Sequence, residues 1–345
     1  MTQSTIDPDT LRAAWLRLLD DEPTLRIRNA ADRLGVSEAE LLATGVGRNV
    51  RRISADVAVL LPRIEAIGPV MALTRNDLFV HEKTGVYRNV DVGHHAAQVV
   101  GNEIDLRIFP ASWVFGFAVE TEGRKGLQRS LQFFDARGVA VHKIFLRDGS
   151  DLEAYETLVD DLLLDDQSTR VELSEARGPS PERPDSDIPV DELVAGWKAM
   201  ADTHDFFQLL RRHEVGRVQA LRLVPDELAR RVDDGALRRV LEGAAEGAVP
   251  IMVFVRNAGT FQIHHGPVHR IVDTEGWLNV LDPGFNLHVR ESGIRGSWVV
   301  RKPTEAGWVT SLELYDADDQ LVALLFGERH EGEVENPAWQ ALLAD

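Results

Sequence analysis

The chain contains the stretch Val70-Met-Ala-Leu-Thr-Arg-Asn76, and a second version of it, Ile251-Met-Val-Phe-Val-Arg-Asn257, begins at position 251, an offset of 181. Two further pairs keep this offset: Asp105-Leu-Arg107 with Asn286-Leu-His288, and Ser130-Leu-Gln-Phe-Phe-Asp135 with Ser311-Leu-Glu-Leu-Tyr-Asp316. Blocks that repeat at one fixed offset are the signature of a duplicated structural unit. We therefore predict two copies of one fold unit.

Each copy begins with helices. Apolar residues recur at helical spacing in both copies, as Leu11, Trp15 and Leu18 and as Leu193, Trp197 and Met200. Trp15 and Trp197 are 182 positions apart, so one small gap aligns these two helices.

The later part of each copy has the pattern of strands and turns. In the first copy the predicted strands are 78–81, 106–109, 114–119, 131–134 and 139–145, with a turn at 135–138. Strands that follow one another without intervening helices favour an antiparallel sheet. A helix over 152–164 closes the copy. The predicted fold class is α+β, a tandem structural repeat with two large antiparallel sheets, flanking helices and a ligand cleft where the halves meet.

A proline-rich segment separates the copies. Residues 176–189 contain four prolines in fourteen positions and almost nothing apolar, which predicts an extended linker. The predicted domains are an N-terminal repeat at 1–175, a linker at 176–190 and a C-terminal repeat at 191–345.

The composition is that of a globular protein from a reducing compartment. The chain has 345 residues, a formal net charge of −18 and no cysteine. The lack of cysteine excludes disulfides and thiolate sites. The sequence shows no secretory signal and no apolar run of about 18 residues, which predicts a cytoplasmic protein without stable membrane insertion. The negative charge argues against nucleic acid as a partner.

One histidine breaks the symmetry between the copies. His204 lies seven residues after Trp197, and the matching place after Trp15 is Glu22. Asp202 or Thr203 can cap the following helix, which would put His204 in its first turn beside Phe206 and Phe207. A neutral imidazole beside an aromatic wall suits haem iron. The alternative is a capping or half-buried polar residue.

Longer motifs carry a resemblance to a known family. They are Trp197–Leu210, Arg301–Leu314, Ser130–Asp135 with Val141–Lys143, and Leu34–Leu41. On these motifs the chain resembles the bacterial haemin transport and degradation factors (HemS/ChuS/PhuS/HmuS-like) over residues 10–340. The resemblance implies two stacked antiparallel sheets with one haem held between the halves. It also implies that His204 is the axial ligand of the haem iron.

The resemblance implies further haem-binding residues. Arg107 matches a distal arginine that could hold a water or an oxygen molecule, which would make it a catalytic group. Phe109 and Phe254 match apolar positions suited to the macrocycle. The positions that match propionate-binding cations are Arg217, Lys302 and Arg329. Phe326 and Glu328 depart from the family's usual Tyr and Gln, and the loss of a phenol and gain of a carboxylate would alter the hydrogen bonding around Arg329.

The implied ligand is haem b, iron protoporphyrin IX, and two mechanisms are open. As a haem oxygenase-like enzyme the protein would open the porphyrin and release iron, using an external electron donor. As a carrier it would deliver haem to a separate haem oxygenase. The partners expected are haem, a haem uptake transporter and a haem oxygenase or reductase.

Two other features suggest different functions. Residues 30–41 imitate a helix-turn-helix with Gly35 at the turn, and 25–53 contain six Arg against three acidic residues, which is typical of a DNA-binding regulator. The pairs His94-His95 and His264-His265 suggest a metal site. Adjacent histidines on a strand point to opposite faces, which favours surface or loop positions for both pairs.

Overall fold

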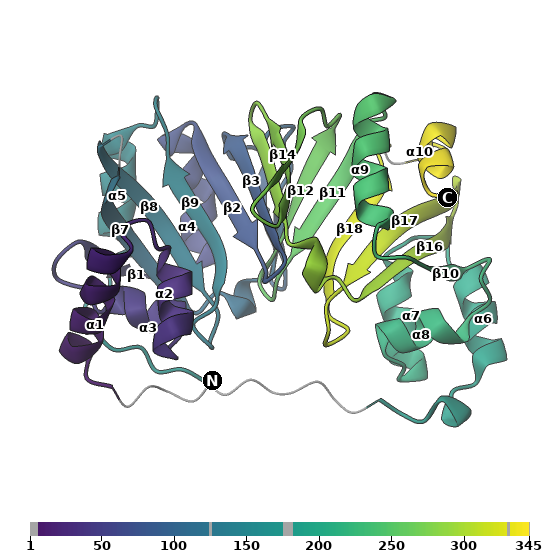
Figure 1. Ribbon diagram of the computed structural model, residues 1–345, viewed down its shortest axis with the longest axis horizontal. Coiled ribbons are helices and arrows are strands. Elements are labelled where there is room, and N and C mark those ends of the chain that lie inside the picture. Colours follow the sequence, from purple (N-terminus) through teal and green to yellow (C-terminus); the bar gives the residue numbers. More distant parts are fainter. Residues whose placement is uncertain (1–5, 124–125, 175–181, 330–331, 345) are drawn as a thin grey trace. The chain divides into compact units, whose positions relative to one another are not determined.

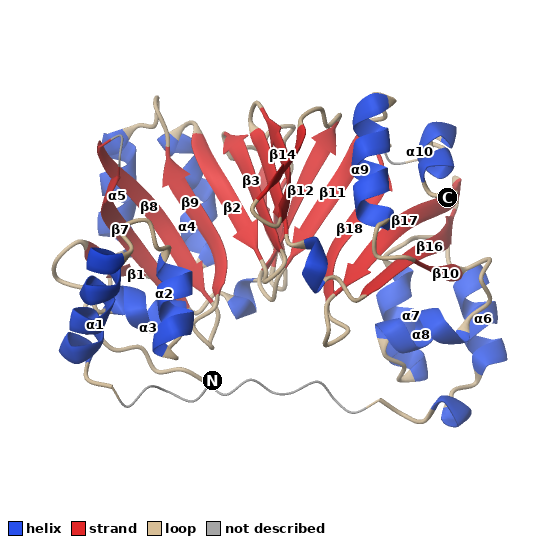
Figure 2. Cartoon of the chain, viewed as in Figure 1, coloured by secondary structure: helices blue, strands red, loops and turns tan. Residues whose placement is uncertain are grey.

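The computed structural model describes residues 6–123, 126–174, 182–329 and 332–344, and its fold is α+β (Figures 1 and 2). The strands form two antiparallel nine-stranded sheets, with the orders β1-β7-β8-β9-β2-β3-β15-β14-β13 and β10-β16-β17-β18-β11-β12-β6-β5-β4. The second order repeats the first when each strand is replaced by its counterpart in the other copy. The predicted tandem repeat with two large antiparallel sheets is confirmed.

The chain divides into two compact units. Of the described residues, unit 1 contains those up to Arg75, those from Glu82 to Ser174, and Asn257–Gln262. Unit 2 contains Asn76–His81, those from Glu182 to Arg256, and those from Ile263 onward. Each unit therefore includes one six-residue segment from the other half of the sequence.

The elements of the first half alternate helices with a long antiparallel meander. Its helices are α1 (Pro8–Asp21), α2 (Ile27–Leu34), α3 (Glu38–Ala43), α4 (Val57–Ile64) and α5 (Leu152–Leu162), with 3₁₀ turns at Glu65–Ile67 and Pro110–Ser112. Its strands are β1 (Val50–Ile53), β2 (Val70–Arg75), β3 (Phe79–Gly85), β4 (Val90–Val92), β5 (Ala97–Val99), β6 (Asp105–Ile108), β7 (Phe115–Gly123), β8 (Gly126–Phe134) and β9 (Ala140–Leu146). The helix predicted to close the first copy is α5.

The second half repeats this plan. Its helices are α6 (Val190–Lys198), α7 (Asp205–His213), α8 (Arg217–Leu223), α9 (Ala236–Glu246) and α10 (Pro337–Leu342), with 3₁₀ turns at Asp185–Asp187 and Glu291–Gly293. Its strands are β10 (Ala229–Val232), β11 (Ile251–Arg256), β12 (Thr260–Gly266), β13 (Ile271–Thr274), β14 (Trp277–Asp282), β15 (Phe285–Val289), β16 (Gly296–Thr304), β17 (Gly307–Tyr315) and β18 (Leu321–Gly327). Strands β2 and β11 differ by 181 positions at both ends, as the repeat predicts.

The strands of unit 2 around β11 have helices against both faces. On β11, Ile251, Val253 and Val255 are buried in a cluster that includes residues of α9 and α10. The opposite face packs Trp298 and Val300 against residues of α6, α7 and α8. Successive residues of a strand point to opposite faces, so the half-buried Met252, Phe254 and Arg256 lie on the α6–α8 side.

The six-residue segments Asn76–His81 and Asn257–Gln262, called the exchanged segments below, are each anchored by an asparagine with the same four hydrogen bonds. Asn76 Nδ2 donates to the carbonyls of Arg256 (2.8 Å) and Val322 (2.9 Å), and Asn76 Oδ1 accepts from the amides of Leu78 and Phe79. At the offset of 181, Asn257 Nδ2 donates to the carbonyls of Arg75 (2.9 Å) and Val141 (2.8 Å), and its Oδ1 accepts from the amides of Gly259 and Thr260. The repeated asparagine therefore has a structural reason in both copies.

The segment between the repeats is only partly described. Residues 176–181 of the predicted linker lie outside the described residues. From Glu182 onward the chain is not simply extended, because Asp185–Asp187 form a 3₁₀ turn and Asp185 Oδ1 accepts from Gln219 Nε2 of α8 (2.8 Å). Ile188 is buried in the same cluster as α8, and α6 begins at Val190.

Candidate functional site

His204 is an exposed residue at the start of α7, where it occupies the N-cap position. It therefore precedes the first helical turn in which it was predicted to lie. Its side chain is 93% exposed, and its Nδ1 lies 2.6 Å from Asp202 Oδ1. The same oxygen accepts from the His204 backbone amide at 2.7 Å, and this bond keeps the pKa of Asp202 below its usual value. The carboxylate thus occupies Nδ1, and Nε2 is the nitrogen that can meet a ligand.

Glu22 is not the structural counterpart of His204. Glu22 caps the C-terminus of α1, whereas the residue at the N-cap of α2, the helix that corresponds to α7, is Arg26. The prediction that placed Glu22 opposite His204, seven residues after each tryptophan, was wrong. Helix α1 has 14 residues and α6 has 9, so the two helices end at different distances from their tryptophans.

The helix that begins after His204 is held to the sheet by Phe206. This ring is buried, and it packs edge-on against Trp197 with centroids 4.4 Å apart. Two cations contact the ring, because Lys302 Nζ and Arg217 Cζ lie 4.7 and 5.0 Å from its centroid. Phe207, by contrast, is 65% exposed and carries Arg211 over its ring. Only Phe206 is therefore part of the packing.

Glu313, a residue that the sequence reasoning missed, holds Arg217 and Lys302 together. The fully buried carboxylate accepts from Arg217 Nε (2.8 Å) and Nη2 (2.7 Å) and from Lys302 Nζ (2.6 Å). Tyr315 Oη donates to it at 2.6 Å and accepts from Arg217 Nε at 2.9 Å. The available signal was an acidic residue in the otherwise uncharged strand 307–315.

The protonation states in this cluster follow from burial and opposing charges. Burial would raise the pKa of Glu313, but the positive charges of Arg217 and Lys302 outweigh it and hold that pKa well below its usual value. Burial lowers the pKa of Lys302 to about 8, although the carboxylate of Glu313 opposes the shift. Only 6% of the Lys302 side chain is exposed, against 27% for Arg217. Arg217 is therefore the cation of this pair that can reach an external carboxylate.

A half-buried apolar surface lies beside the cluster. Across the sheet Glu313 is paired with Leu324, and Leu324 with Phe254, so the three share one face. The rings of Phe254 and Phe326 pack edge-on with centroids 5.3 Å apart. Arg329 follows β18 and is partly buried. Unit 2 thus contains five of the seven predicted site residues, namely His204, Arg217, Phe254, Lys302 and Arg329.

Arg107 and Phe109 belong to unit 1. Arg107 lies on β6, where its Nη1 donates to the carboxylate of Asp105 and to the carbonyl of Leu106 (3.0 Å), and its side chain is 40% exposed. Phe109 is half-buried and packs edge-on against Phe261 at 6.1 Å. Both are placed by β6 and the 3₁₀ turn that follows it.

A second polar network is buried in unit 1. The ring nitrogens of His142 lie 2.9 Å from Thr74 Oγ1 and 2.6 Å from Tyr87 Oη. Burial lowers the pKa of His142 to about 3 and raises that of Tyr87. Because both nitrogens are already hydrogen-bonded in the core, His142 is a structural residue.

The histidine pairs are only partly where they were predicted. His94 and His95 are exposed in a turn. His264 is buried on β12 and stacks on Phe285 at 3.8 Å, so the expectation of a surface or loop position is wrong for this pair. An alternating strand pattern was overlooked there. In the described part of the chain, no three His, Asp or Glu side chains gather as metal ligands would.

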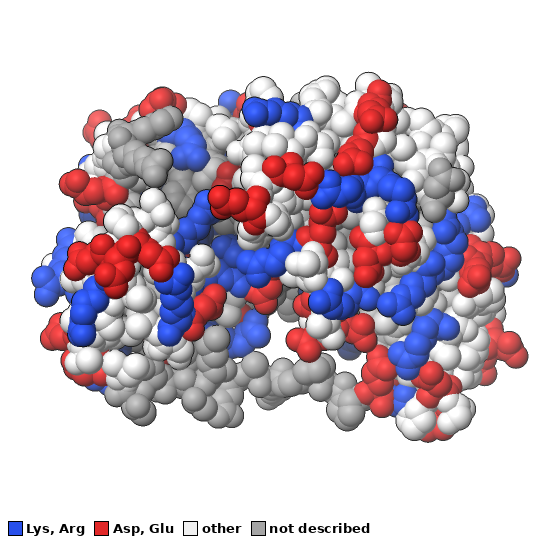
Figure 3. All heavy atoms as spheres, in the orientation of Figure 1, with Lys and Arg blue, Asp and Glu red and all other residues white. Residues whose placement is uncertain are grey.

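The segment that imitates a helix-turn-helix lacks a free recognition helix. Helices α2 and α3 do flank Gly35, which adopts a left-handed conformation. All six residues of α3 are buried, however, so this helix cannot enter a DNA groove. The face drawn in Figure 3 shows Lys and Arg interspersed with Asp and Glu. The DNA-binding hypothesis therefore loses its structural basis.

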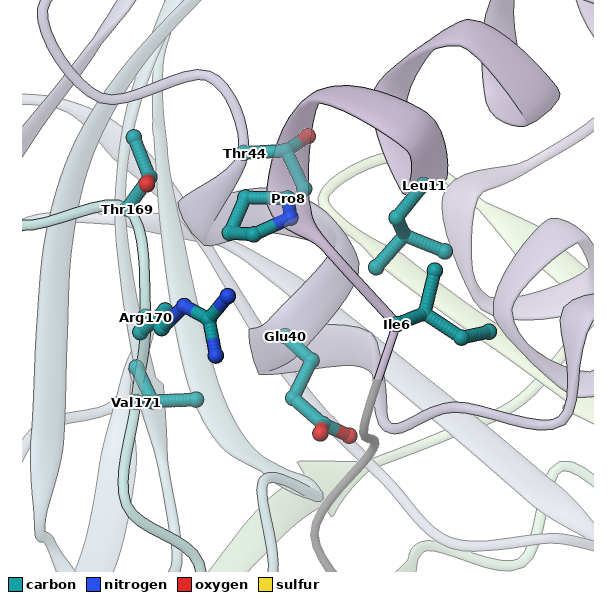
Figure 4. A pocket seen from close by; sticks show the side chains of 8 residues that line it. All are labelled: Ile6, Pro8, Leu11, Glu40, Thr44, Thr169, Arg170 and Val171. Atoms are coloured by element: carbon teal, nitrogen blue, oxygen red, sulfur yellow. The ribbon is translucent and has the colours of Figure 1, made fainter.

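The pocket shown in Figure 4 lies in unit 1 and contains none of the predicted site residues. Its lining consists of Ile6, Pro8, Leu11, Glu40, Thr44, Thr169, Arg170 and Val171. Glu40 already serves the capping box of α3, where it accepts from the Ser37 amide at 2.8 Å. Among the described helices, none is long and apolar enough to cross a membrane.

Comparison with family models identifies one domain twice. The haemin-degrading HemS.ChuX domain matches residues 35–162 and 214–345. Each of the two matches lies within one of the two predicted copies.

Curated and solved proteins are similar over nearly the whole chain. The haemin transport protein HmuS of Yersinia pestis is 37% identical over 337 residues, which is 97% of this chain and 96% of HmuS. The holo structure of PhuS, a haem-binding protein from Pseudomonas aeruginosa, is 46% identical with a TM-score of 0.96, covering 98% of this chain and 99% of PhuS. The haem-degrading enzyme ChuS of Escherichia coli O157:H7 is 35% identical with a TM-score of 0.91, covering 98% and 99% of the two chains.

Proposed function

The chain belongs to the haemin-degrading HemS/ChuX domain family, and from this premise we propose that it binds haem b through His204. Its relatives are haem-binding, haem-degrading and haemin-transport proteins, so its role lies in haem utilisation. Haem would be the substrate or the cargo of the protein. When bound, it supplies the iron that activates oxygen and a porphyrin that can be oxidised.

The observation that carries the proposal is the exposed imidazole of His204. Its Nδ1 is taken by Asp202 and its side chain is 93% exposed, so Nε2 is available to an iron that approaches from solvent. Haem iron is commonly held by one neutral imidazole nitrogen. The buried His142, with both nitrogens bonded to Thr74 and Tyr87, offers no such atom.

The charge of the neighbouring cluster fits an anionic ligand. Arg217 and Lys302 surround Glu313. Two cations and one carboxylate leave a net charge of +1, which a propionate would balance. Arg217 would bind a propionate directly, while Lys302 would act mainly by adding charge. Arg329 is a further candidate cation.

Apolar residues complete the proposed site. Phe254 and Phe326 offer half-buried ring surface on the same face of unit 2, suited to a flat macrocycle. Phe109 of unit 1 is the second aromatic candidate. Arg107 would steer a distal ligand with a guanidinium that Asp105 already orients.

We infer two possible activities for such a site. In the first, the protein degrades haem with oxygen and an external electron donor and releases iron. In the second, it carries haem from an uptake transporter to a separate haem oxygenase or reductase. The two activities are distinguished by adding haem and a reductant to the protein in air, with and without catalase. Catalase-insensitive loss of the Soret band with iron release supports the enzyme, and catalase-sensitive loss supports the carrier.

Haemin titration tests the binding proposal itself. The wild-type protein should bind one haemin per chain, and His204→Ala should weaken binding and shift the Soret maximum. The matched control is Arg26→Ala, because Arg26 is the exposed residue at the corresponding helix cap of unit 1. Identical spectra for wild type and His204→Ala would contradict the assignment of His204.

A further inference from the structure

A five-residue loop holds His204 through two carboxylates. The loop spans residues 201–205. Asp205 Oδ2 accepts from the amides of Ala201 (3.3 Å) and Asp202 (3.2 Å), so the two ends of the loop are joined. Asp202 Oδ1 accepts from both the amide and Nδ1 of His204. The loop is tied to the end of β16, because the Ala201 carbonyl accepts from the Glu305 amide at 3.0 Å.

We propose that Asp202 is a positioning residue for the haem iron, which fixes His204 as the Nδ1-protonated tautomer and strengthens electron donation from Nε2. This inference rests on the proposed function. An ionised carboxylate can only accept hydrogen bonds, so the nitrogen that faces it must carry the proton. Bonding at that nitrogen raises the basicity of the other one and orients the ring.

The exposure of His204 is what makes this bond necessary. A side chain that is 93% exposed has almost no packing to select a rotamer or a ring orientation. The contact of 2.6 Å between Nδ1 and Asp202 supplies that selection. Asp202 thus performs for an exposed imidazole the orienting role that a core would perform for a buried one.

A purely structural role for Asp202 is the competing explanation. Asp202 also caps the loop through the His204 amide, and losing that bond alone would disturb the loop. Asp202→Asn separates the roles, because an amide oxygen still accepts from the backbone but carries no charge. Asp205→Asn is the matched control, since Asp205 holds the loop but has no bond to the imidazole.

The first test uses the haem-free protein. Nitrogen-15 shifts of the His204 ring, measured where the imidazole is neutral, should report the Nδ1-protonated tautomer as dominant in wild type and in Asp205→Asn. Asp202→Ala should show a mixture of tautomers with Nε2-protonated imidazole in excess. The same tautomer population in wild type and Asp202→Ala would overturn the inference, whether or not the protein binds haem.

The second test uses the haem complex. The ferrous iron–histidine stretching frequency should fall from wild type to Asp202→Asn and again to Asp202→Ala, while Asp205→Asn keeps the wild-type value. Haemin affinity should fall roughly 10–100-fold in Asp202→Ala, as for other outer-sphere partners of metal-binding histidines. An unchanged frequency in Asp202→Ala, or an equal shift in Asp205→Asn, would overturn the inference.

The two proposals fail in different ways. If His204→Ala leaves the haem spectrum unchanged, the proposed function is wrong. If His204→Ala abolishes the iron–histidine band but Asp202→Ala leaves its frequency unchanged, the proposed function stands and the role of Asp202 is wrong.

Discussion

The two units have corresponding strands but bury different polar groups. Unit 1 buries His142, Thr74 and Tyr87 on the side of α4 and α5, and the residues 181 positions later are Ala323, Val255 and Val268, all in an apolar core. Unit 2 buries Glu313 and Tyr315 on the other face, where unit 1 has Gln132 and Phe134. The two copies therefore have the same arrangement of strands but differ in which of their equivalent positions carry buried polar side chains.

Helices α3 and α8 correspond to each other in the two units, and their first residues carry opposite charges. Glu38 is the first residue of α3 and pairs with Lys143, which makes a neutral pair. Arg217 is the first residue of α8, where a cation opposes the helix dipole. Glu313 offsets that cost, and the cluster retains an excess of positive charge. The difference marks unit 2 as the copy suited to an anionic ligand.

The largest expected effect comes from removing the central carboxylate of unit 2. Glu313→Ala leaves Arg217 and Lys302 buried without a counter-charge, which should lower the unfolding free energy by about 3–5 kcal/mol. The matched change in unit 1, Gln132→Ala, removes a neutral side chain bonded to Ser130 and should cost about 1 kcal/mol from that bond. Urea unfolding measures both. Equal losses would remove the asymmetry between the copies.

The asparagines provide a symmetric counterpart to that test. Asn76→Ala and Asn257→Ala each remove four hydrogen bonds, two within the six-residue segment and two that join it to the rest of its unit, so each should cost about 2–4 kcal/mol. The two losses should be similar, because the two asparagines make the same set of bonds. Amide hydrogen exchange at β3 and β12 shows which segment loosens. A silent substitution in one copy would mean that the copies no longer share this anchor.

The repeat and the helix that follows His204 were predictable from the sequence, but the polar clusters were not. The offset of 181 survives because strands tolerate few insertions, and β2 and β11 align at both ends. Glu313 was missed because sequence distance hides its cross-strand and helix partners: Arg217 is 96 residues away. The counterpart of His204 was misplaced because connections after helices change length freely. His264 was misplaced because adjacency was weighed above strand alternation.

The histidine network should give the two cores different responses to acid. The pKa of His142 in the folded protein is about 3, below the usual 6.5. Below pH 6.5 the imidazole is therefore protonated in the unfolded state while it stays neutral in the folded state. The unfolding free energy should therefore fall as pH falls, by about 1.6 kcal/mol between pH 6.5 and 5, and the slope approaches about 1.4 kcal/mol per pH unit near pH 5. Comparing wild type with His142→Gln isolates this contribution, because the variant lacks the titrating group. Parallel stability–pH curves would contradict the assignment.

A hydroxyl exchange between the units gives the smallest and sharpest contrast. Tyr315 Oη donates to Glu313 and accepts from Arg217, whereas its counterpart in unit 1 is Phe134. Tyr315→Phe should therefore cost about 1–1.5 kcal/mol, as expected for a bond to a charged group. Phe134→Tyr should not bring a matching gain, because the neighbouring Gln132 and Lys143 are not arranged like Glu313 and Arg217, and a buried hydroxyl without a partner is itself destabilising by about 1–3 kcal/mol. Thermal unfolding of the two single variants decides the point. If Phe134→Tyr stabilises the protein, the polar cluster of unit 2 is a property of the shared backbone and not of its own side chains.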